Sequence, residues 1–186
     1  KELSYLLFDI EGTTSDIKFV KDVMFPYSEK ELPVFLENNQ NNAQVQALMR
    51  ETSLDELLGF IRDDVKHPTL TTLQGMIWQQ AFENGDFQAH LYPDVLPAWK
   101  SWRSAGFQLG IYSSGSATAQ KMFFGHTTEG NLLNYLENHF DLEIGNKKEA
   151  QSYKSIADIL GLNPKEILFF SDVPEELDAA SDSEFQ

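Results

Sequence analysis

Residues 5–20 read YLLFDIEGTTSDIKFV, an apolar run that ends in two carboxylates. Leu3–Phe8 has the length and apolar character of a buried strand, and Gly12 indicates that a loop follows it. Strand alternation predicts that Asp9 and Glu11 leave the strand end on the same side, at the edge where open α/β sheets bind ligands. Buried charge is costly without a cationic partner, so the pair indicates a site for Mg²⁺ or for phosphoryl transfer to a carboxylate. The alternative is a strand that ends in solvent with ordinary loop acids.

Two further apolar runs, Phe107–Tyr112 and Ile167–Phe170, have the same strand character. Each follows a helical pattern that stops at a glycine, and these patterns span Pro93–Gly106 and Glu149–Gly161. Strands that alternate with helices predict an α/β fold with a doubly wound, mostly parallel, Rossmann-like sheet.

The segment between the first two strands contains no convincing strand. Ser53 and Glu56 have the spacing of a capping box. Apolar residues then recur at helical spacing, at Leu54, Leu57, Leu58, Ile61, Leu70, Leu73, Ile77 and Phe82. We therefore predict an all-helical domain at 19–91, inserted into an α/β core formed by 1–18 and 92–186. The final residues, ELDAASDSEFQ, predict a helix and the first residues of a further strand, so we expect the chain to be a fragment at its C-terminus.

Composition narrows the classes of function. The chain has 186 residues, of which 41% are hydrophobic, which is typical of a folded protein. Its formal charge of −15 argues against binding to nucleic acid or to an anionic membrane, and it means that an anionic substrate needs a local cation. There is no cysteine, no secretory signal pattern and no apolar run near the roughly 20 residues of a membrane span, so we predict a cytoplasmic location.

Polar residues follow the second predicted strand in the sequence YSSGS. Ser113 and Ser114 stand where this strand gives way to a helix, whose N-terminal amides favour an anion. A serine hydroxyl there can donate to a phosphoryl oxygen. The alternative is an ordinary capped turn.

Two more clusters contain charged residues. Lys147 and Lys148 precede a helix and could supply the local cation, although paired lysines are also typical of a solvated surface. Asp172 follows the third predicted strand as Asp9 follows the first, and it would complete a carboxylate site for a divalent ion. Glu175 and Glu176 open the next helix, where acids are common because of the helix dipole.

The order of these motifs resembles that of the haloacid dehalogenase-like phosphohydrolases, from Leu3 to the end of the chain. The helical insert looks like the cap domain of that superfamily. Four stretches more closely resemble the enolase-phosphatase family: FDIEGTTSDIKFVKDVMFPY, HLYPDVLPAW, YSSGSATAQKMFFGH and GNKKEAQSYKSIA. The chain departs from the common superfamily pattern at Glu11, where a second aspartate is typical.

The resemblance implies a role for each motif. Asp9, Glu11 and Asp172 would serve Mg²⁺, with Glu11 acting through its carboxylate or its main-chain carbonyl. Asp9 would also be the nucleophile, and Glu11 the acid and base. Substrate-binding residues would be Ser113, Ser114 and Lys147, and Glu176 would orient a water at the metal.

The resemblance further implies a monomeric enzyme of methionine salvage. Its substrate would be a phosphorylated diketone, 2,3-diketo-5-methylthiopentyl-1-phosphate, which is enolised and then dephosphorylated to acireductone. Two alternatives stay open: a phosphatase of the same superfamily with another small substrate, and a signalling receiver that holds phosphate on an aspartate.

The remaining candidates have weaker signals. The histidines lack the short spacing of metal ligands, so we interpret His67, His90, His126 and His139 as structural. Aromatic residues after the first motif could line a pocket for the methylthio group or could pack between helices, and these are Phe19, Phe25 and Tyr27.

Overall fold

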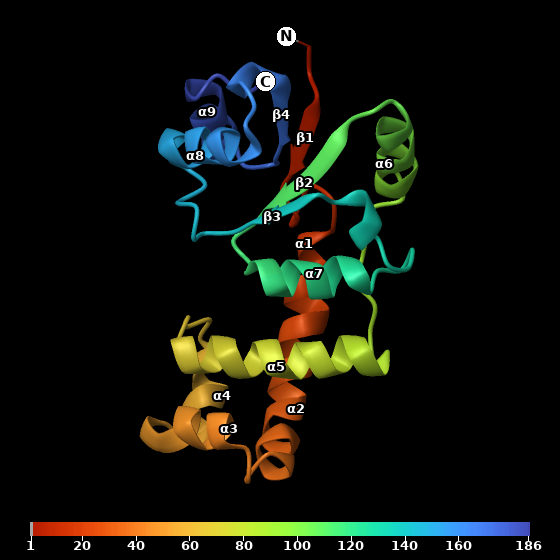
Figure 1. The fold of residues 1–186 in the computed structure, drawn as a ribbon. Coiled ribbons are helices and arrows are strands. Elements are labelled where there is room, and N and C mark those ends of the chain that lie inside the picture. Colours follow the sequence, from red (N-terminus) through yellow and green to blue (C-terminus); the bar gives the residue numbers. More distant parts are fainter. Residues whose placement is uncertain (1) are drawn as a thin grey trace. The chain divides into compact units, whose positions relative to one another are not determined.

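The computed structural model describes residues 2–186, which divide into two compact units. The sheet unit comprises the residues up to Ile17 together with Gln88–Gln186, and the helical unit comprises Lys18–Phe87. Figure 1 shows both units coloured along the sequence. Residues 88–91, which the sequence placed in the insert, belong to the sheet unit, and Lys18, which it placed in the core, belongs to the helical unit.

The sheet unit is built on four parallel strands in the order β3-β2-β1-β4. Phe8 pairs with Ile111 on one side and with Phe170 on the other, so the carboxyl ends of the strands lie at one edge. The strands are β1 (Tyr5–Phe8), β2 (Gln108–Tyr112), β3 (Asn138–Phe140) and β4 (Ile167–Phe170). Three of them confirm predictions from sequence, whereas β3 was not predicted because only three residues form it and two of these are polar.

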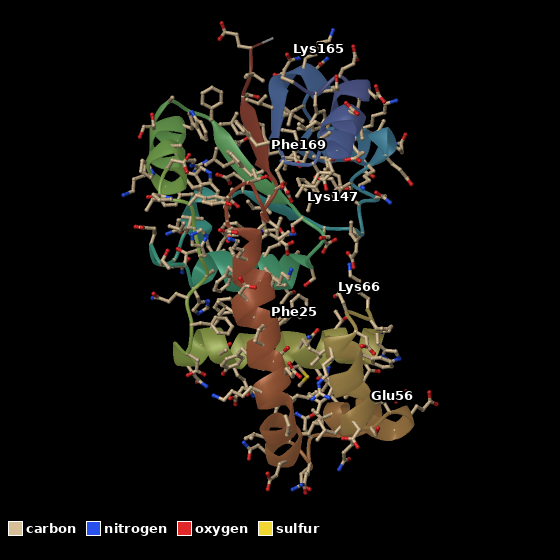
Figure 2. All side chains as sticks on the ribbon, turned by 180° about the vertical axis from the view of Figure 1, so that it is seen from behind. Phe25, Glu56, Lys66, Lys147, Lys165 and Phe169 are labelled. Atoms are coloured by element: carbon tan, nitrogen blue, oxygen red, sulfur yellow. The ribbon has the colours of Figure 1, made fainter. Side chains whose placement is uncertain are left out.

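Helices cover both faces of the sheet. Successive side chains of a strand point to opposite faces. Leu7 therefore faces a core that includes Tyr153 of α8 (Ala150–Leu160) and Ala179 of α9 (Pro174–Asp182). Phe169 of β4, labelled in Figure 2, lies in the same core.

On the other face, the ring of Phe8 lies 5.6 Å from Trp99 of α6 (Val95–Ser104). Trp99 in turn contacts Phe124 of α7 (Ala117–Gly125) at 5.6 Å. This arrangement confirms the predicted doubly wound α/β core.

The helical unit has no strand among its residues, all of which the structure describes. Leu32, Phe35, Leu57 and Leu73 lie at the centre of its own hydrophobic core. Half of the predicted capping box is present: Ser53 Oγ accepts a hydrogen bond from the Glu56 N–H at 3.2 Å, while the Glu56 carboxylate accepts from Thr52 Oγ1 at 2.7 Å. The elements after α1 (Ile17–Phe19) are a π-helical turn, η1 (Val20–Met24), α2 (Phe25–Asn38), α3 (Ala43–Leu48), a 3-10 turn, η2 (Met49–Glu51), α4 (Leu54–Arg62) and α5 (Pro68–Asn84). Within residues 2–186, no helix is both long and apolar enough to cross a membrane.

The last described residues pair with β4. The Gln186 N–H donates to Ile167 O at 2.9 Å, and the Phe169 N–H donates to Gln186 O at 3.1 Å. Two further 3-10 turns precede strands, η3 (Leu133–Tyr135) before β3 and η4 (Pro164–Glu166) before β4. The helix followed by strand-like pairing agrees with the pattern predicted for this stretch.

Candidate active site

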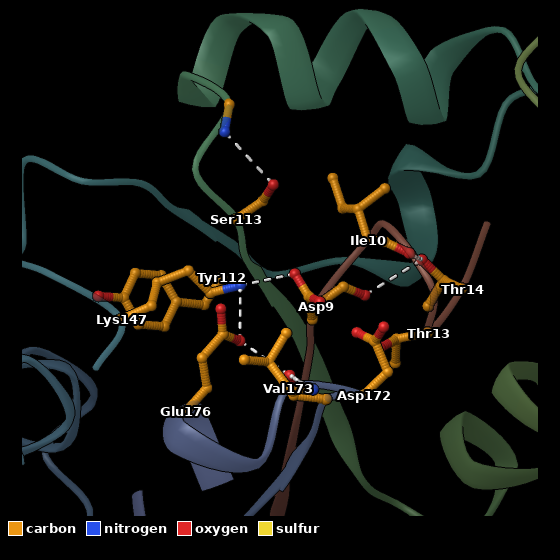
Figure 3. A network of polar contacts seen from close by, with 12 residues as sticks. Asp9, Ile10, Thr13, Thr14, Tyr112, Ser113, Lys147, Asp172, Val173 and Glu176 are labelled. Atoms are coloured by element: carbon orange, nitrogen blue, oxygen red, sulfur yellow. Dashed lines mark hydrogen bonds and ion pairs between the residues drawn. The ribbon is translucent and has the colours of Figure 1, made fainter. Parts of the chain in front are cut away.

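Polar residues gather at the carboxyl edge of the sheet. Asp9 directly follows β1, Ser113 directly follows β2, and Asp172 comes two residues after β4. Lys147 lies on the connection after β3. Figure 3 shows these four side chains around one centre, together with Glu176 from the first turn of α9.

A buried ion-pair network joins three of these residues. Lys147 Nζ lies 2.6 Å from Asp9 Oδ1 and 3.0 Å from Glu176 Oε2. All three side chains are buried, and Lys147 Nζ also lies 5.6 Å from the ring centre of Tyr112. One ammonium therefore balances two buried carboxylates, which leaves a local excess of negative charge. Of the two neighbouring lysines, the structure brings Lys147 to Asp9, while Lys148 is exposed.

This environment alters the acidity of Asp9. Burial, and to a smaller extent the charge of Glu176, raise the pKa of Asp9 from 3.8 to about 6 against the opposing effect of Lys147. Ionised Asp9 is thus held in a site where any additional cation would stabilise it.

The main chain around Lys147 is fixed by buried hydroxyl groups. Tyr153 OH donates to Lys147 O at 2.5 Å, and Tyr112 OH donates to Gly145 O at 2.7 Å. Burial raises the pKa of Tyr112 to about 12 and raises the pKa of Tyr153 as well, so both phenols stay neutral donors. Gly145 has φ +136° and leaves no room for a side chain, because a Cβ would lie 2.2 Å from Ser152 Oγ. These contacts fix the main chain at residues 145–147 and thereby the direction in which Lys147 leaves it.

Asp172 lies against the loop that follows Asp9. The loop passes Asp172 at Gly12, where φ is +78° and a Cβ would lie 2.2 Å from Asp172 Oδ2. Thr13 Oγ1 lies 3.5 Å from Asp172 Oδ1, a long contact, and the Asp172 side chain is exposed. A glycine is therefore required here both for the backbone and for the close approach of a carboxylate.

Within the ion-pair network, Glu176 has a second partner besides Lys147. Ser171 Oγ donates to Glu176 Oε2 at 2.8 Å and accepts from the Val173 N–H at 3.1 Å. The sequence predicted that Glu176 would act on a water at the metal, whereas the contacts seen here are with Lys147 and Ser171.

Glu11 differs from Asp9 in its surroundings. β1 ends at Phe8, so the alternation of a strand does not continue to Glu11, and its side chain is exposed while that of Asp9 is buried. Across residues 2–186, no three His, Asp or Glu side chains are arranged to hold a metal ion. Asp9 and Asp172 could supply two carboxylates, and the main-chain alternative for Glu11 stays a prediction.

The serine motif forms a tight turn before α7. Ser113 is buried and its Oγ accepts from the Gly115 N–H at 3.3 Å, whereas Ser114 is exposed. Two amides at the start of α7 already have protein partners: the Ala117 N–H donates to Asp141 Oδ2 and the Ala119 N–H donates to Ser116 Oγ. An anion would therefore be bound by the turn rather than by those two helix amides.

Sequence reasoning missed several supporting residues. Gln120 is buried, and its Nε2 donates to Gly115 O at 2.9 Å and to Phe140 O at 2.7 Å. Nothing in the local pattern of α7 distinguishes Gln120 from a surface glutamine. Asp141 could have been found, because Phe140–Asp141 after β3 repeats the strand-end pattern Phe8–Asp9.

The histidines have varied local roles. His67 Nδ1 accepts from the Thr69 N–H at the start of α5, and His126 Nδ1 lies 2.8 Å from Met122 O. His139 Nδ1 is buried without a hydrogen-bond partner among the described residues, and burial lowers the pKa of this ring. His90 contacts the end of the loop after Asp9, where its Nδ1 accepts from the Asp16 N–H.

Known proteins similar in sequence to this chain belong to one family of hydrolases. Residues 4–183 match the haloacid dehalogenase-like hydrolase family. The chain is 47% identical to enolase-phosphatase E1 of Gluconobacter oxydans over 182 residues, which cover 94% of this chain and 80% of that protein. It is 42% identical to enolase-phosphatase E1 of Thioalkalivibrio sulfidiphilus, over 96% of this chain and 85% of that protein.

Solved structures agree with this assignment. The crystal structure of UTR4 protein from Saccharomyces cerevisiae aligns with a TM-score of 0.84 and 33% identity, covering 100% of this chain and 88% of that one. L-2-haloacid dehalogenase from Xanthobacter autotrophicus, at 19% identity, 98% and 75% coverage and a TM-score of 0.61, shares the fold. The chain belongs to the enolase-phosphatase family of the haloacid dehalogenase-like hydrolases.

Proposed function

We propose that this protein is an enolase-phosphatase of methionine salvage, which converts 2,3-diketo-5-methylthiopentyl-1-phosphate to acireductone and phosphate. The observation that carries the proposal is the buried contact of Lys147 Nζ with Asp9 Oδ1, 2.6 Å apart, at the carboxyl edge of the sheet. A carboxylate nucleophile beside a fixed cation suits attack on a phosphate monoester, and the curated relatives carry the same activity in their names.

Asp9 is the nucleophile in this proposal. Its carboxylate attacks phosphorus in line, the bond from phosphorus to the leaving oxygen breaks, and an aspartyl-phosphate forms. Lys147 neutralises phosphoryl oxygens while it holds Asp9, and Ser113 and Ser114 donate to the remaining oxygens. Water then releases phosphate and restores the carboxylate.

Glu11 supplies proton transfer. In dephosphorylation it protonates the leaving enolate oxygen and later removes a proton from the attacking water. We also assign it the removal of the carbon-bound proton in the preceding enolisation, because its side chain is exposed at the loop and is longer than that of aspartate. Glu176 holds Lys147 in place through its ion pair with Lys147 Nζ.

Mg²⁺ fits the chemistry of the site. The donor groups are carboxylate oxygens, which Mg²⁺ prefers: Asp9 and Glu176 share the Lys147 ammonium, and Asp172 lies against the loop that follows Asp9. Asp9 and Asp172 would hold the ion, with Glu11 as the third protein ligand. When bound, Mg²⁺ supplies positive charge to the phosphoryl and enolate oxygens.

The helical unit is assigned as a cap domain that selects the substrate. Its aromatic side chains Phe19, Tyr27, Phe82 and Phe87 pack on one another within this unit, which supports the packing interpretation of Phe19 and Tyr27. We keep a monomeric state and a cytoplasmic location as parts of the proposal.

The proposal is tested by following phosphate and the ultraviolet absorbance of the enediol product together. With the diketone phosphate and Mg²⁺, we expect both signals to rise in equal amounts and both to vanish in EDTA. Phosphate without an enediol would identify a superfamily phosphatase with another substrate. A stable stoichiometric phosphoprotein without turnover would instead support the receiver.

A further inference from the structure

His90 joins two segments of the sheet unit that are far apart in sequence. The Asp16 N–H donates to His90 Nδ1 at 3.0 Å, across 74 positions, and Ser15 Oγ lies 3.5 Å from the same nitrogen. A second bond runs from the Tyr92 N–H to Thr14 O at 2.9 Å. The end of the loop after Asp9 is thus tied to the segment through which the chain returns to the sheet unit.

The ring of His90 is held in one form. A nitrogen that accepts from a main-chain N–H carries no proton, so Nδ1 is the accepting nitrogen of this ring. The half-buried ring also packs edge-on against Tyr92, with centroids 5.3 Å apart and planes at 89°. Its Nδ1 is therefore a fixed acceptor for the Asp16 N–H.

The loop that His90 holds is the loop that carries Glu11. Ile10 O accepts three main-chain hydrogen bonds, from the N–H groups of Thr13, Thr14 and Ser15. The Gly12 N–H donates to Ser15 O at 2.7 Å, and Glu11 pairs with Ser15 through a main-chain bridge. Because the loop is cross-linked internally, a displacement at Asp16 is transmitted to Glu11.

We propose that His90 is a positioning residue for Glu11, acting through the Asp16 N–H. The proposal rests on the proposed function only in taking Glu11 as the proton donor to the leaving oxygen. As the bond between Asp9 and phosphorus forms and the ester bond breaks, the proton of Glu11 passes to that oxygen. A misplaced general acid forfeits part of the roughly 10²–10⁴-fold that such proton transfer contributes.

Two substrates with different leaving groups distinguish a misplaced Glu11 from a general loss of structure at the site. An enolate or alkoxide leaving group needs a proton, whereas p-nitrophenolate leaves without one. His90→Ala removes the acceptor for Asp16. His90→Asn keeps an oxygen near the place of Nδ1. His67→Ala is the matched control, because His67 Nδ1 accepts from the Thr69 N–H at 3.3 Å in the helical unit.

In His90→Ala, we expect the rate of enediol formation from the diketone phosphate in a single turnover to fall by about tenfold or more, whereas the burst rate of p-nitrophenolate, which precedes the attack of water on the aspartyl-phosphate, should stay within about twofold. His90→Asn should recover most of the loss, and His67→Ala should leave both rates unchanged. In a Glu11→Gln background, His90→Ala should have no further effect, because the two residues act as one unit.

Equal losses on both substrates, a His90→Asn variant as impaired as His90→Ala, or additive losses in the Glu11→Gln background would overturn the proposal. Turnover of p-nitrophenyl phosphate without turnover of the diketone phosphate would contradict the proposed function instead. In that case glycerol 1-phosphate, whose alkoxide leaving group also needs a proton, replaces the diketone phosphate, and its rate is compared with the rate on p-nitrophenyl phosphate in the same variants.

Discussion

The surroundings of Asp9 act on the pKa of its carboxyl group in opposite directions. Burial and Glu176 favour its neutral form, while Lys147 at 2.6 Å favours the anion. A nucleophile in this position is ionised at neutral pH but is easily stabilised by more positive charge. The same balance should be visible in the stability of the protein.

The pH dependence of stability gives the first prediction. The pKa of Asp9 is about 6 when folded against an ordinary value of 3.8, so the folded state binds this proton more tightly than the unfolded state. Stability due to this group is therefore present at low pH and is lost as pH rises through about 6. In EDTA, the free energy of unfolding of Asp9→Asn relative to the parent should rise between about pH 4 and pH 7, by on the order of 3 kcal/mol. Denaturant titrations that give a flat difference would contradict the raised pKa.

Gly12 gives a second prediction. An alanine at Gly12 would place its Cβ 2.2 Å from Asp172 Oδ2, so Gly12→Ala should displace Asp172. We expect activity to fall by about tenfold or more and the Mg²⁺ concentration for half-maximal activity to rise. Gly161→Ala is the control, because Gly161 has φ +66° and, its two chain neighbours apart, no atom lies within 4 Å of the place its Cβ would take.

Gly161→Ala should cost roughly 1 kcal/mol of stability from backbone strain and leave activity intact. Equal activity losses in the two variants would mean that strain, rather than the approach to Asp172, explains the effect of Gly12→Ala.

At the scale of elements, α7 and the ends of β2 and β3 are joined by one buried side chain. Gln120 Nε2 donates to Gly115 O in the serine turn and to Phe140 O at the end of β3. The Ser113 N–H also donates to Phe140 O, at 3.1 Å. The geometry of the serine turn therefore depends on a residue that does not belong to it.

Replacing this donor gives the third prediction. Gln120→Glu sets an oxygen against two carbonyl oxygens, so the serine turn should loosen and stability should fall by about 1–3 kcal/mol. The inhibition constant of inorganic phosphate should rise by about tenfold, as measured by competition with the diketone phosphate. Gln151→Glu, at an exposed position of α8, serves as the control and should change neither quantity. Unchanged phosphate inhibition in Gln120→Glu would show that the turn does not bind phosphate.

The sequence predicted elements well where apolar runs and caps were strong. β1, β2 and β4 are apolar throughout or nearly so, and the glycines after α6 and α8 stop both helices as expected. β3 reads NHF, too short and too polar for a pattern to detect, and the sheet recruits it by pairing with β2. At the site, Asp9, Ser113, Lys147 and Asp172 could be predicted because each lies in a recognisable motif. Gln120 could not be predicted, because its role depends on carbonyls brought together only by folding.

At the scale of the whole molecule, the formal charge of −15 opposes an anionic substrate. The opposing cation, Lys147, is buried and already paired with two carboxylates, so long-range attraction is weak. This gives the fourth prediction. Raising the salt concentration from about 20 to 150 mM screens the long-range repulsion, and kcat/KM for the diketone phosphate should rise modestly, by about twofold. A steep fall with salt would show that surface cations steer the substrate.

In the proposed two-stage reaction, Asp9 is the nucleophile. The most direct test compares the parent with Asp9→Asn, each with the diketone phosphate and Mg²⁺, and records phosphate and enediol absorbance while circular dichroism checks the fold. We expect the folded Asp9→Asn variant to release no phosphate above background. Phosphate release from that variant at a rate near that of the parent would show that Asp9 is not the nucleophile.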